Sequence, residues 1–341
     1  NIGFTIGNSI PFESYYTPSI DISNRVKLFR KHFYQMAKKQ KGIFKTDNGI
    51  ALAENRQELK KELENAKAIG ETTDGKKIYL YANAEDNVLI KEIGRLREIS
   101  FRQVKEGSQK QRDIDDFDYC YEHIILWDDK DLEIVGSYRI VKVAEMIDAF
   151  GIDGLYTSTL FEYKEEFDKY LSNSIELGRS FIQPKYWNSR ALDYLWQGIG
   201  AYLRTNPDIR YMFGCVSISN SYSDEAIAML VFFYMNYFGS KEKSVKHYDS
   251  YILSESNKRK FDDIFFKNDY AKDMVVLKHE LQLMGLSIPT LYKQYSELCD
   301  NDGVQFMDFG RDREFENCID GFLIVDTDKL KPQKRKRYLD R

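Results

Sequence analysis

Length, composition and charge already narrow the classes to which this chain can belong. Its 341 residues are 43% hydrophobic and 14% aromatic, far from the low hydrophobicity of disordered chains, so it can bury a sizeable core. Fifty lysines and arginines against 54 aspartates and glutamates give a net charge of −4, which excludes the basic field that a nucleic-acid partner requires. The longest apolar run without a charge, residues 226–238, is shorter than the ~20 residues of a membrane-spanning helix. Four widely spaced cysteines, with no histidine cluster at zinc spacing, predict a cytoplasmic protein without a metal site.

The first 75 residues are not expected to form a core of their own. Residues 3–11 are typical of a strand entering a turn, and a basic helix over 23–41 has apolar residues at i, i+3 and i+4 spacing. A polar helix over 54–68 and a Gly- and Thr-rich turn over 70–75 follow. Because so short a stretch buries little surface, we interpret residues 1–75 as the end of a preceding domain plus a helical linker.

From residue 76 the pattern changes to the strands and helices of an α+β fold, which we expect to extend to residue 330. Strands are predicted over 77–81, 121–127, 133–143, 174–182, 211–218, 303–309 and 321–326. Helices are predicted over 86–104, 189–204 with Asn188 or Ser189 as its cap, and 223–238. The basic tail 331–341 is expected to be a solvated terminus; the alternative is attraction to anionic lipid head groups or to an acidic carrier protein.

Several charged residues fall where scaffold alone does not explain them. Arg97 lies on the apolar stripe of its helix, either buried or snorkelling at the stripe's edge. The four carboxylates within residues 113–118 are typical of a solvated loop or of helix capping. Arg139 shares a strand face with Val135 and Val141 because side chains alternate, and a charge on an apolar face needs a partner.

The stretch Ser174-Ile-Glu-Leu-Gly-Arg-Ser180 gives the sharpest signal. Glu176 and Arg179 would face opposite sides of a regular strand, yet a bulge at Gly178 would bring both to one face. A bulge would also free backbone N–H groups to hold a carbonyl oxygen as charge develops on it. The alternative is a purely structural buried ion pair, which is costly to keep.

Two other patterns are set aside. His123-Ile-Ile-Leu-Trp-Asp128 matches the His-x-x-x-x-Asp motif of glycerolipid acyltransferases, but five residues along a strand point the two side chains to opposite faces, so we interpret the match as accidental. Cys215 lies in an apolar strand and is expected to be a core thiol.

Linked motifs over residues 75–330 resemble, in order and spacing, the signature of the acyl-homoserine-lactone (autoinducer) synthases. The motifs are Leu96-Arg-x-x-x-Phe101, Asp115-x-Phe-Asp118, Gly136-x-x-Arg139 and Glu176-x-x-Arg179-Ser180. The stretch 115–217 is more closely similar to the ornithine-lipid and N-acyl-amino-acid synthases, often named hemolysin-like. Both groups belong to the GNAT superfamily. The resemblance implies a GNAT-like, autoinducer-synthase-like fold, in which a central mixed sheet is flanked by helices, here with N-terminal and C-terminal extensions.

The resemblance also implies an activity and roles for these residues. The activity is N-acyl transfer, in which a fatty acyl chain carried as a thioester is joined to the amine of an amino acid to give an N-acyl amino acid or lyso-aminolipid. Glu176 would accept the amine's proton, and Arg179 and Arg139 would hold it in place. Tyr222 is a candidate to protonate the leaving thiolate. The residues expected around the substrate are Arg97, Phe101, Asp115, Asp118 and Ser180.

The acyl donor and partners follow from one departure. GNAT enzymes that use acetyl-CoA carry a Gln/Arg-x-x-Gly-x-Gly/Ala loop after the fourth strand, and Gln183–Ser189 stands there instead. This favours an acyl-carrier-protein thioester as cosubstrate over coenzyme A, with no tightly bound cofactor. The expected partners are acyl carrier protein and an amino acid, with peripheral contact to anionic lipid at the inner membrane as a further option.

The N-terminal residues have a resemblance of their own. Phe4-Thr-Ile-Gly-x-x-Ile-Pro11 is similar to the last strand of a lysophospholipid acyltransferase domain, which in some relatives is fused upstream. The alternative functions are therefore O-acylation of a lysolipid by a longer fused protein, and membrane lysis by a hemolysin without enzymatic activity.

Overall fold

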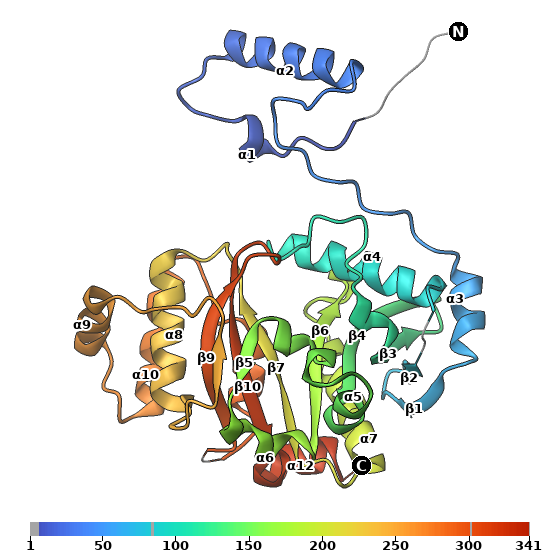
Figure 1. The fold of residues 1–341 in the computed structure, drawn as a ribbon, viewed down its shortest axis with the longest axis vertical. Coiled ribbons are helices and arrows are strands. Elements are labelled where there is room, and N and C mark those ends of the chain that lie inside the picture. Colours follow the sequence, from blue (N-terminus) through green and yellow to red (C-terminus); the bar gives the residue numbers. More distant parts are fainter. Residues whose placement is uncertain (1–6, 83–84, 301, 341) are drawn as a thin grey trace.

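An eight-stranded sheet forms the centre of the molecule (Figure 1). The computed structural model describes residues 7–82, 85–300 and 302–340. In spatial order the strands are β1 (Lys67–Glu71), β2 (Lys77–Ala82), β3 (Glu122–Asp128), β4 (Glu133–Lys142), β6 (Ser174–Ile182), β7 (Tyr211–Ile218), β10 (Cys318–Asp326) and β9 (Val304–Asp312). Neighbours run antiparallel except β6 and β7, which are parallel. Two short strands, β5 (Phe161–Tyr163) and β8 (Val245–His247), pair separately.

Helices cover both faces of the sheet. On one face lie α4 (Val88–Gln103) and α5 (Val143–Phe150), and on the other lie α7 (Ala191–Thr205), α8 (Asp224–Phe238), α10 (Tyr270–Leu283) and α11 (Thr290–Ser296). Alternation along β3 shows the division, since Ile124 and Leu126 pack in the cluster with α7 and α8 while Ile125 and Trp127 pack in the cluster with α4. This is the α+β architecture predicted, and we call the two surfaces the α4 face and the α7 face.

Most predicted elements are confirmed, and the misses have local causes. Strands β6 and β7 have the predicted bounds. The N-cap position of α7 is Arg190, one residue later than predicted, and Arg190 makes no side-chain capping bond. The Ser189 hydroxyl nevertheless accepts the Ala191 N–H at 3.1 Å, while Asn188 takes a left-handed φ of 61°. The other helices are α1 (Phe12–Tyr15), α2 (Ile22–Ala37), α3 (Arg56–Leu63), α6 (Asp168–Leu171), α9 (Glu255–Ile264) and α12 (Pro332–Tyr338).

The sheet-containing unit starts earlier than residue 76. Strand β1 pairs with β2, and Leu59 and Leu63 of α3 pack in the cluster that includes α4. Residues 7–47, which contain α1 and α2, lie apart from this unit (Figure 1). The chain meets the unit at Asn48, which hydrogen-bonds Arg102 and Gln109. Of the strand expected over residues 3–11, residues 3–6 lie outside the described residues, and residues 7–11 make only an isolated bridge between Ser9 and Asp47.

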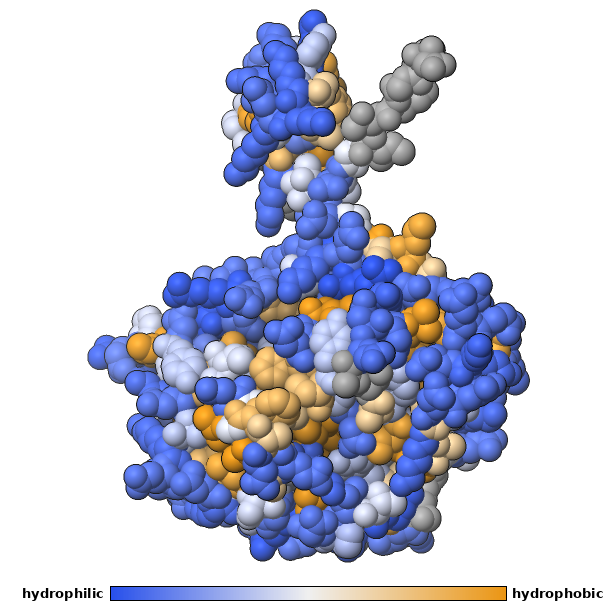
Figure 2. Space-filling model, turned by 45° about the vertical axis from the view of Figure 1, so that its right-hand side comes forward, coloured by the Kyte–Doolittle hydropathy of each residue, from blue (hydrophilic) through white to orange (hydrophobic). Residues whose placement is uncertain are grey.

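The surface of the N-terminal segment differs from that of the rest. Figure 2 shows a largely hydrophilic exterior with apolar residues grouped on parts of the body and on this segment. On α2, Ile22, Val26 and Phe33 are exposed. In the described part of the chain, no helix is long and apolar enough to cross a membrane.

The basic tail is docked rather than solvated. Residues 332–338 form α12, whose Tyr338 side chain is 5% exposed. Arg204 of α7 donates to the Tyr338 carbonyl at 2.8 Å, and Arg337 pairs with Asp193 at 2.7 Å. A Cβ on Gly200 would lie 2.0 Å from the Tyr338 carbonyl oxygen, so α12 approaches α7 as closely as only a glycine allows. The expectation of a free terminus failed because the apolar partner of α12 lies more than 100 residues away in the chain.

Candidate active site

The sheet opens between its two parallel strands. Strands β6 and β7 pair only over Ser174–Glu176 and Tyr211–Phe213. A Cβ on Gly214 would lie 2.1 Å from the Leu177 carbonyl oxygen, so the strands make their last close approach at a glycine. Beyond it, residues 178–180 of β6 and alternate residues of β7 become partly exposed, whereas the paired parts are mostly buried. The opening therefore gives solvent access to the middle of the sheet.

The predicted bulge lies on β6, one residue later than expected. The register between β4 and β6 shifts opposite Tyr138, and Arg179 itself adopts a left-handed φ of 47° while Gly178 does not. Such a conformation costs a non-glycine residue roughly 1–2 kcal/mol, so tertiary contacts must hold it. The bulge brings Glu176 and Arg179 to the α4 face. It sends Ser180 to the other face, where its hydroxyl hydrogen-bonds Tyr138.

A second irregularity corrects the face assigned to β4. The register between β3 and β4 shifts opposite Val135, which then packs in the α7-face cluster while Val141 packs on the α4 face. Arg139 and Val141 share a face as predicted, but Val135 does not, because the extra residue reverses the alternation.

Three arginines and three aspartates alternate in a closed ring of ion pairs on the α4 face. In order round the ring they are Arg97, Asp118, Arg139, Asp115, Arg179 and Asp113. Arg97 binds Asp118 through both guanidinium Nη atoms at 2.9 and 3.1 Å. The two ion pairs of Arg179 are 3.5 and 3.7 Å long, which is outside good hydrogen-bonding geometry. Arg97 and Arg139 each hydrogen-bond a carboxylate directly, whereas Arg179 is loosely held.

The ring is buried, and its arginines keep Asp118 ionised. Burial raises the pKa of the Asp118 carboxyl, but Arg97 and Arg139 outweigh it and hold that pKa well below its ordinary value. The Asp118 and Arg97 side chains are each 1% exposed. The solvated-loop interpretation of residues 113–118 and the snorkelling interpretation of Arg97 were therefore wrong. The partners come from α4, β4 and β6, which the local pattern could not reveal. The helix-capping alternative is present as well, since Asp115 and Asp118 form a capping box on the turn that follows.

Glu176 anchors the segment that covers the ring. Its carboxylate accepts hydrogen bonds from the Tyr121 hydroxyl, from the Tyr156 N–H at 3.1 Å and from the Thr157 N–H at 2.6 Å. Burial raises the pKa of Glu176 above its ordinary value, although these donors oppose the shift. Both carboxylate oxygens are occupied, so Glu176 fixes the short helical turn Tyr156–Thr159 against β6.

Aromatic rings hold the two arginines in place. The guanidinium groups of Arg139 and Arg179 lie 5.1 and 5.0 Å from the centre of the Tyr156 ring. Phe315, in the β9–β10 hairpin, lies 4.9 Å from Arg179, and Phe101 packs edge-on against Phe315 at 5.0 Å. Of these rings only Phe101 was predicted. Tyr156 and Phe315 lie in irregular segments, where periodicity gives no signal.

The remaining candidates lie elsewhere or differ in detail. Tyr222 is apart from the ring, because its hydroxyl donates to the Ser287 carbonyl and its ring borders the α7-face cluster. His123 is buried beside Asp118, and desolvation lowers its pKa to about 4, so it is neutral at pH 7. Asp128 accepts instead from the Lys130 N–H, so it and His123 form no relay. Cys215 lies at the opening and is partly exposed, so it is not a fully buried core thiol as expected. Its surroundings still desolvate the thiol and raise its pKa.

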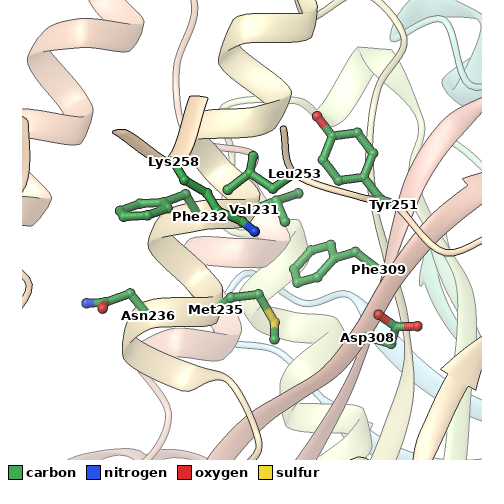
Figure 3. Close-up of a pocket in the computed structure, with 9 residues that line it drawn as sticks. All are labelled: Val231, Phe232, Met235, Asn236, Tyr251, Leu253, Lys258, Asp308 and Phe309. Carbon is green, nitrogen blue, oxygen red and sulfur yellow. The ribbon is translucent and has the colours of Figure 1, made fainter. Parts of the chain in front are cut away.

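One apolar pocket lies away from the ring, at the edge of the sheet. It has a volume of ≈ 360 Å³ and lies between α8, β9 and the segment before α9 (Figure 3). Its lining is Val231, Phe232, Met235, Asn236, Tyr251, Leu253, Lys258, Asp308 and Phe309. Two strands, β7 and β10, separate β9 from β6, so this pocket does not reach the arginines and we assign it no part in the chemistry.

Comparison with known proteins places this arrangement in a family. Residues 96–197, which hold the ring and Glu176, match the model of an acetyltransferase (GNAT) domain. Among solved structures, the chain resembles a CoA-dependent acyl-homoserine lactone synthase at 13% identity and a TM-score of 0.29, over 67% of this chain and 74% of that one.

Curated relatives are more similar. The glycine N(alpha)-acyltransferase of Bacteroides thetaiotaomicron is 30% identical over 82% of this chain and 86% of its own length, and that of Phocaeicola vulgatus is 30% identical over 83% and 90%. The L-ornithine N(alpha)-acyltransferase of Rhizobium meliloti is 31% identical over 41% of this chain and 48% of its own length. The protein is an acyltransferase, and the chain belongs to the GNAT family that includes the glycine N(alpha)-acyltransferases.

Proposed function

We propose that this protein transfers a fatty acyl chain from a thioester to the α-amino group of an amino acid. The observation that carries the proposal is Arg179, a mostly buried guanidinium beside an opening in the sheet, whose Nε atom has no partner among the described residues and whose ion pairs are long. A guanidinium with free donors binds a carboxylate in a planar, two-point geometry. Names of the relatives, which act on glycine and ornithine, support an amino acid as the acceptor.

The reaction needs positioning and proton transfer but no covalent enzyme intermediate. A neutral amine attacks the thioester carbonyl, the C–N bond forms, and the C–S bond breaks as the thiolate leaves. Arg179 holds the acceptor's carboxylate, and the separated strands offer backbone N–H groups to the carbonyl oxygen as it becomes negative. Because the Tyr222 hydroxyl is taken up by the Ser287 carbonyl, we assign the thiolate's proton to the attacking nitrogen.

Acyl carrier protein remains our proposed donor. The segment before α7 supports this, because four of its backbone N–H groups are already bonded: those of Tyr186, Trp187 and Ser189 to backbone carbonyls, and that of Ala191 to a serine hydroxyl. A pyrophosphate would need such groups free. Basic side chains also gather nearby, since Arg190 and Arg337 are both half-exposed and both pair with Asp193. An acidic carrier protein is complementary to such a surface.

The test incubates the purified chain with acyl-carrier-protein and acyl-CoA thioesters and a panel of glycine, ornithine, lysine and serine, with N-acyl products read by mass spectrometry. We expect product with at least one amino acid, and a lower KM for the carrier-protein donor. Arg179→Lys should raise the KM for the amino acid at least tenfold, whereas Arg210→Lys, at the far end of β7, should not. Absence of N-acyl product with every pair would refute the proposed function. An equal preference for acyl-CoA would refute the donor alone.

A further inference from the structure

We propose that Asp320 on β10 accepts the proton of the amino-acid ammonium, and that Glu176 is a positioning residue. This assignment rests on the proposed function and names the base of that reaction. Asp320 is the third residue of the strand Cys318–Asp326, whose other carboxylate, Asp326, is its last residue. The neighbours Ile319 and Phe322 are fully buried apolar residues. The predicted strand began at residue 321 and left Asp320 out.

The register of the sheet places Asp320 behind the opening. On β10, Asp320 pairs with Ser217 of β7, and Phe322 pairs with Cys215. Both β7 residues are on the stretch that becomes partly exposed once β6 has separated. Asp320 itself is 2% exposed and shares their face, so its carboxylate lies one strand further from Arg179, across the opening.

Asp320 has only neutral partners. The Ser217 hydroxyl and the Cys318 thiol, the latter at 3.4 Å, donate to its carboxylate. Among the described residues, no lysine, arginine or histidine forms an ion pair with it. A buried carboxylate without a counter-ion is costly, and structures retain one where a ligand supplies the cation.

Arg179 lacks close hydrogen-bond acceptors, just as Asp320 lacks a cation. It has an unpartnered Nε, and its nearest carboxylates, on Asp113 and Asp115, are 3.5 to 3.7 Å away. The side chain of Arg139 is fully buried and lies against the same Tyr156 ring as Arg179. Its Nε and Nη2 atoms also have no hydrogen-bond partner among the described residues. Arg179 and Asp320 influence each other but form no ion pair within the described residues. A cation lacking an acceptor and an anion lacking a donor, on two sides of one opening, fit the two charges of a zwitterionic amino acid.

The electrostatics of Asp320 suit a base. The groups that face it are Asp312 on β9, Ser217 on β7, Cys318 on its own strand, Arg179 on β6, Tyr156, and Glu106 just after α4. Burial and the Asp312 charge raise the pKa of Asp320 to about 6. Burial and Asp320 raise the pKa of Glu106 to about 8. At pH 7 Asp320 is therefore ionised, and it is a stronger proton acceptor than an exposed aspartate.

The competing carboxylates are already used. Glu176 would have to give up the hydrogen bond of the Tyr156 or Thr157 N–H in order to take a proton in the same geometry. Asp312 accepts from the N–H groups of Glu314 and Phe315 and so shapes the hairpin that holds Phe315 against Arg179. Glu106, the remaining carboxylate that faces Asp320, has a pKa raised to about 8 and is therefore mostly protonated at pH 7. Among the described residues, Asp320 is thus the buried carboxylate at the opening that is ionised at pH 7 and still has accepting capacity.

With this assignment every proton and bond of the reaction is accounted for. The ammonium of the acceptor loses one proton to the Asp320 carboxylate, which becomes a neutral acid. The free amine attacks the thioester carbonyl and forms the C–N bond. When the C–S bond breaks, the thiolate takes the second nitrogen proton and leaves as a thiol. Asp320 then releases its proton to solvent, so each turnover yields one amide, one thiol and one proton.

The experiment compares two acceptors that differ in their need for a base. One is the amino acid of the panel that reacts fastest, and the other is aminooxyacetate, which carries a carboxylate but whose amine is neutral at pH 7. Rates are corrected for the uncatalysed reaction, and thermal unfolding checks that each variant folds. Asp320→Asn should slow amino-acid acylation by about 10²–10⁴-fold, the usual contribution of a general base, with the KM for the thioester unchanged. With aminooxyacetate it should stay within about tenfold of wild type.

The matched variants make the outcome decisive. Glu176→Gln should slow both acceptors by the same factor, as expected of a positioning residue, and Asp326→Asn on the same strand should slow neither. The rate of wild type on the amino acid should be level above pH 6 and fall below it, whereas the residual activity of Asp320→Asn, which depends on the free amine in solution, should rise steadily with pH and show no break near pH 6. An active wild type whose Asp320→Asn variant slows both acceptors equally, or slows neither, would overturn this assignment and leave the proposed function standing. A wild type that makes no N-acyl product would overturn both.

Discussion

Replacing Asp320 by asparagine is expected to make the fold more stable above pH 6, although the same change removes the proposed base. Asparagine has nearly the same shape and keeps an oxygen for the Ser217 hydroxyl. Asparagine carries no charge, so its burial does not have the desolvation cost of burying an ionised carboxylate. Functional groups are often kept at such a cost in stability.

The magnitude follows from the pKa of Asp320. A rise from 3.8 in the unfolded chain to about 6 in the folded protein means that the unfolded state loses this proton first as pH increases. The stability contributed by the protonated carboxyl is fully present below pH 3.8 and is lost as pH rises through 6, which corresponds to about 3 kcal/mol. The asparagine variant has no such loss. The difference in the free energy of unfolding, variant minus wild type, should therefore grow by about 2.4 kcal/mol between pH 4 and pH 8.

Urea unfolding followed by far-UV circular dichroism at pH 4, 5, 6, 7 and 8 measures this difference directly. Asp326→Asn serves as the control on the same strand. Its carboxylate pairs with Arg210 at 2.8 Å, so its loss should lower the free energy of unfolding instead. A pH-independent difference for Asp320→Asn, or a variant that loses stability towards pH 8, would refute the reasoning about burial.

Three further predictions concern the ring and two close approaches. Asp118→Asn leaves two buried arginines short of a partner and should lower the free energy of unfolding by about 3–5 kcal/mol, as measured by urea unfolding at pH 7. A fall below 1 kcal/mol would contradict the ring's rigidity. Gly214→Ala places a methyl group 2.1 Å from the β6 backbone and should cost about 1–3 kcal/mol and most of the activity, whereas Gly178→Ala, with open space around it, should cost little in stability. Equal effects would show that the close approach is not required. Gly200→Ala should displace α12 and make it sensitive to limited proteolysis, and an unchanged cleavage pattern would contradict its docking.

Local sequence patterns predicted what depends on near neighbours. Runs rich in apolar residues and bounded by polar ones gave the bounds of β6 and β7, and helical spacing gave α4 and α8 within two residues at each end. Strand β1 was missed because four of its five residues are exposed, which leaves no alternation to detect. Helix α12 was missed because its sequence is basic and its buried contacts come from α7.

The candidate site was predicted only in part, for the same reason. Glu176, Arg139 and Arg97 were singled out because a charge within an apolar pattern is conspicuous. Their partners were assigned to a solvated loop, since nothing near Asp118 in the sequence indicates that two buried arginines pair with it. Asp320 carries the same kind of signal, a carboxylate within an apolar strand, and would have been found had the strand been started at Cys318.

The amino-acid sequence by itself determined the α+β class, the order of the elements and the set of charged residues that cannot be scaffold, because hydrophobic periodicity and residue chemistry are local properties. Only the tertiary structure decided which charges pair and which do not. Ion pairs and strand registers join residues far apart in the chain, and a one-residue bulge reverses the face of every side chain beyond it. For that reason the ring of ion pairs, the position of Ser180 on the α7 face and the lack of a counter-ion for Asp320 became visible only in the folded protein.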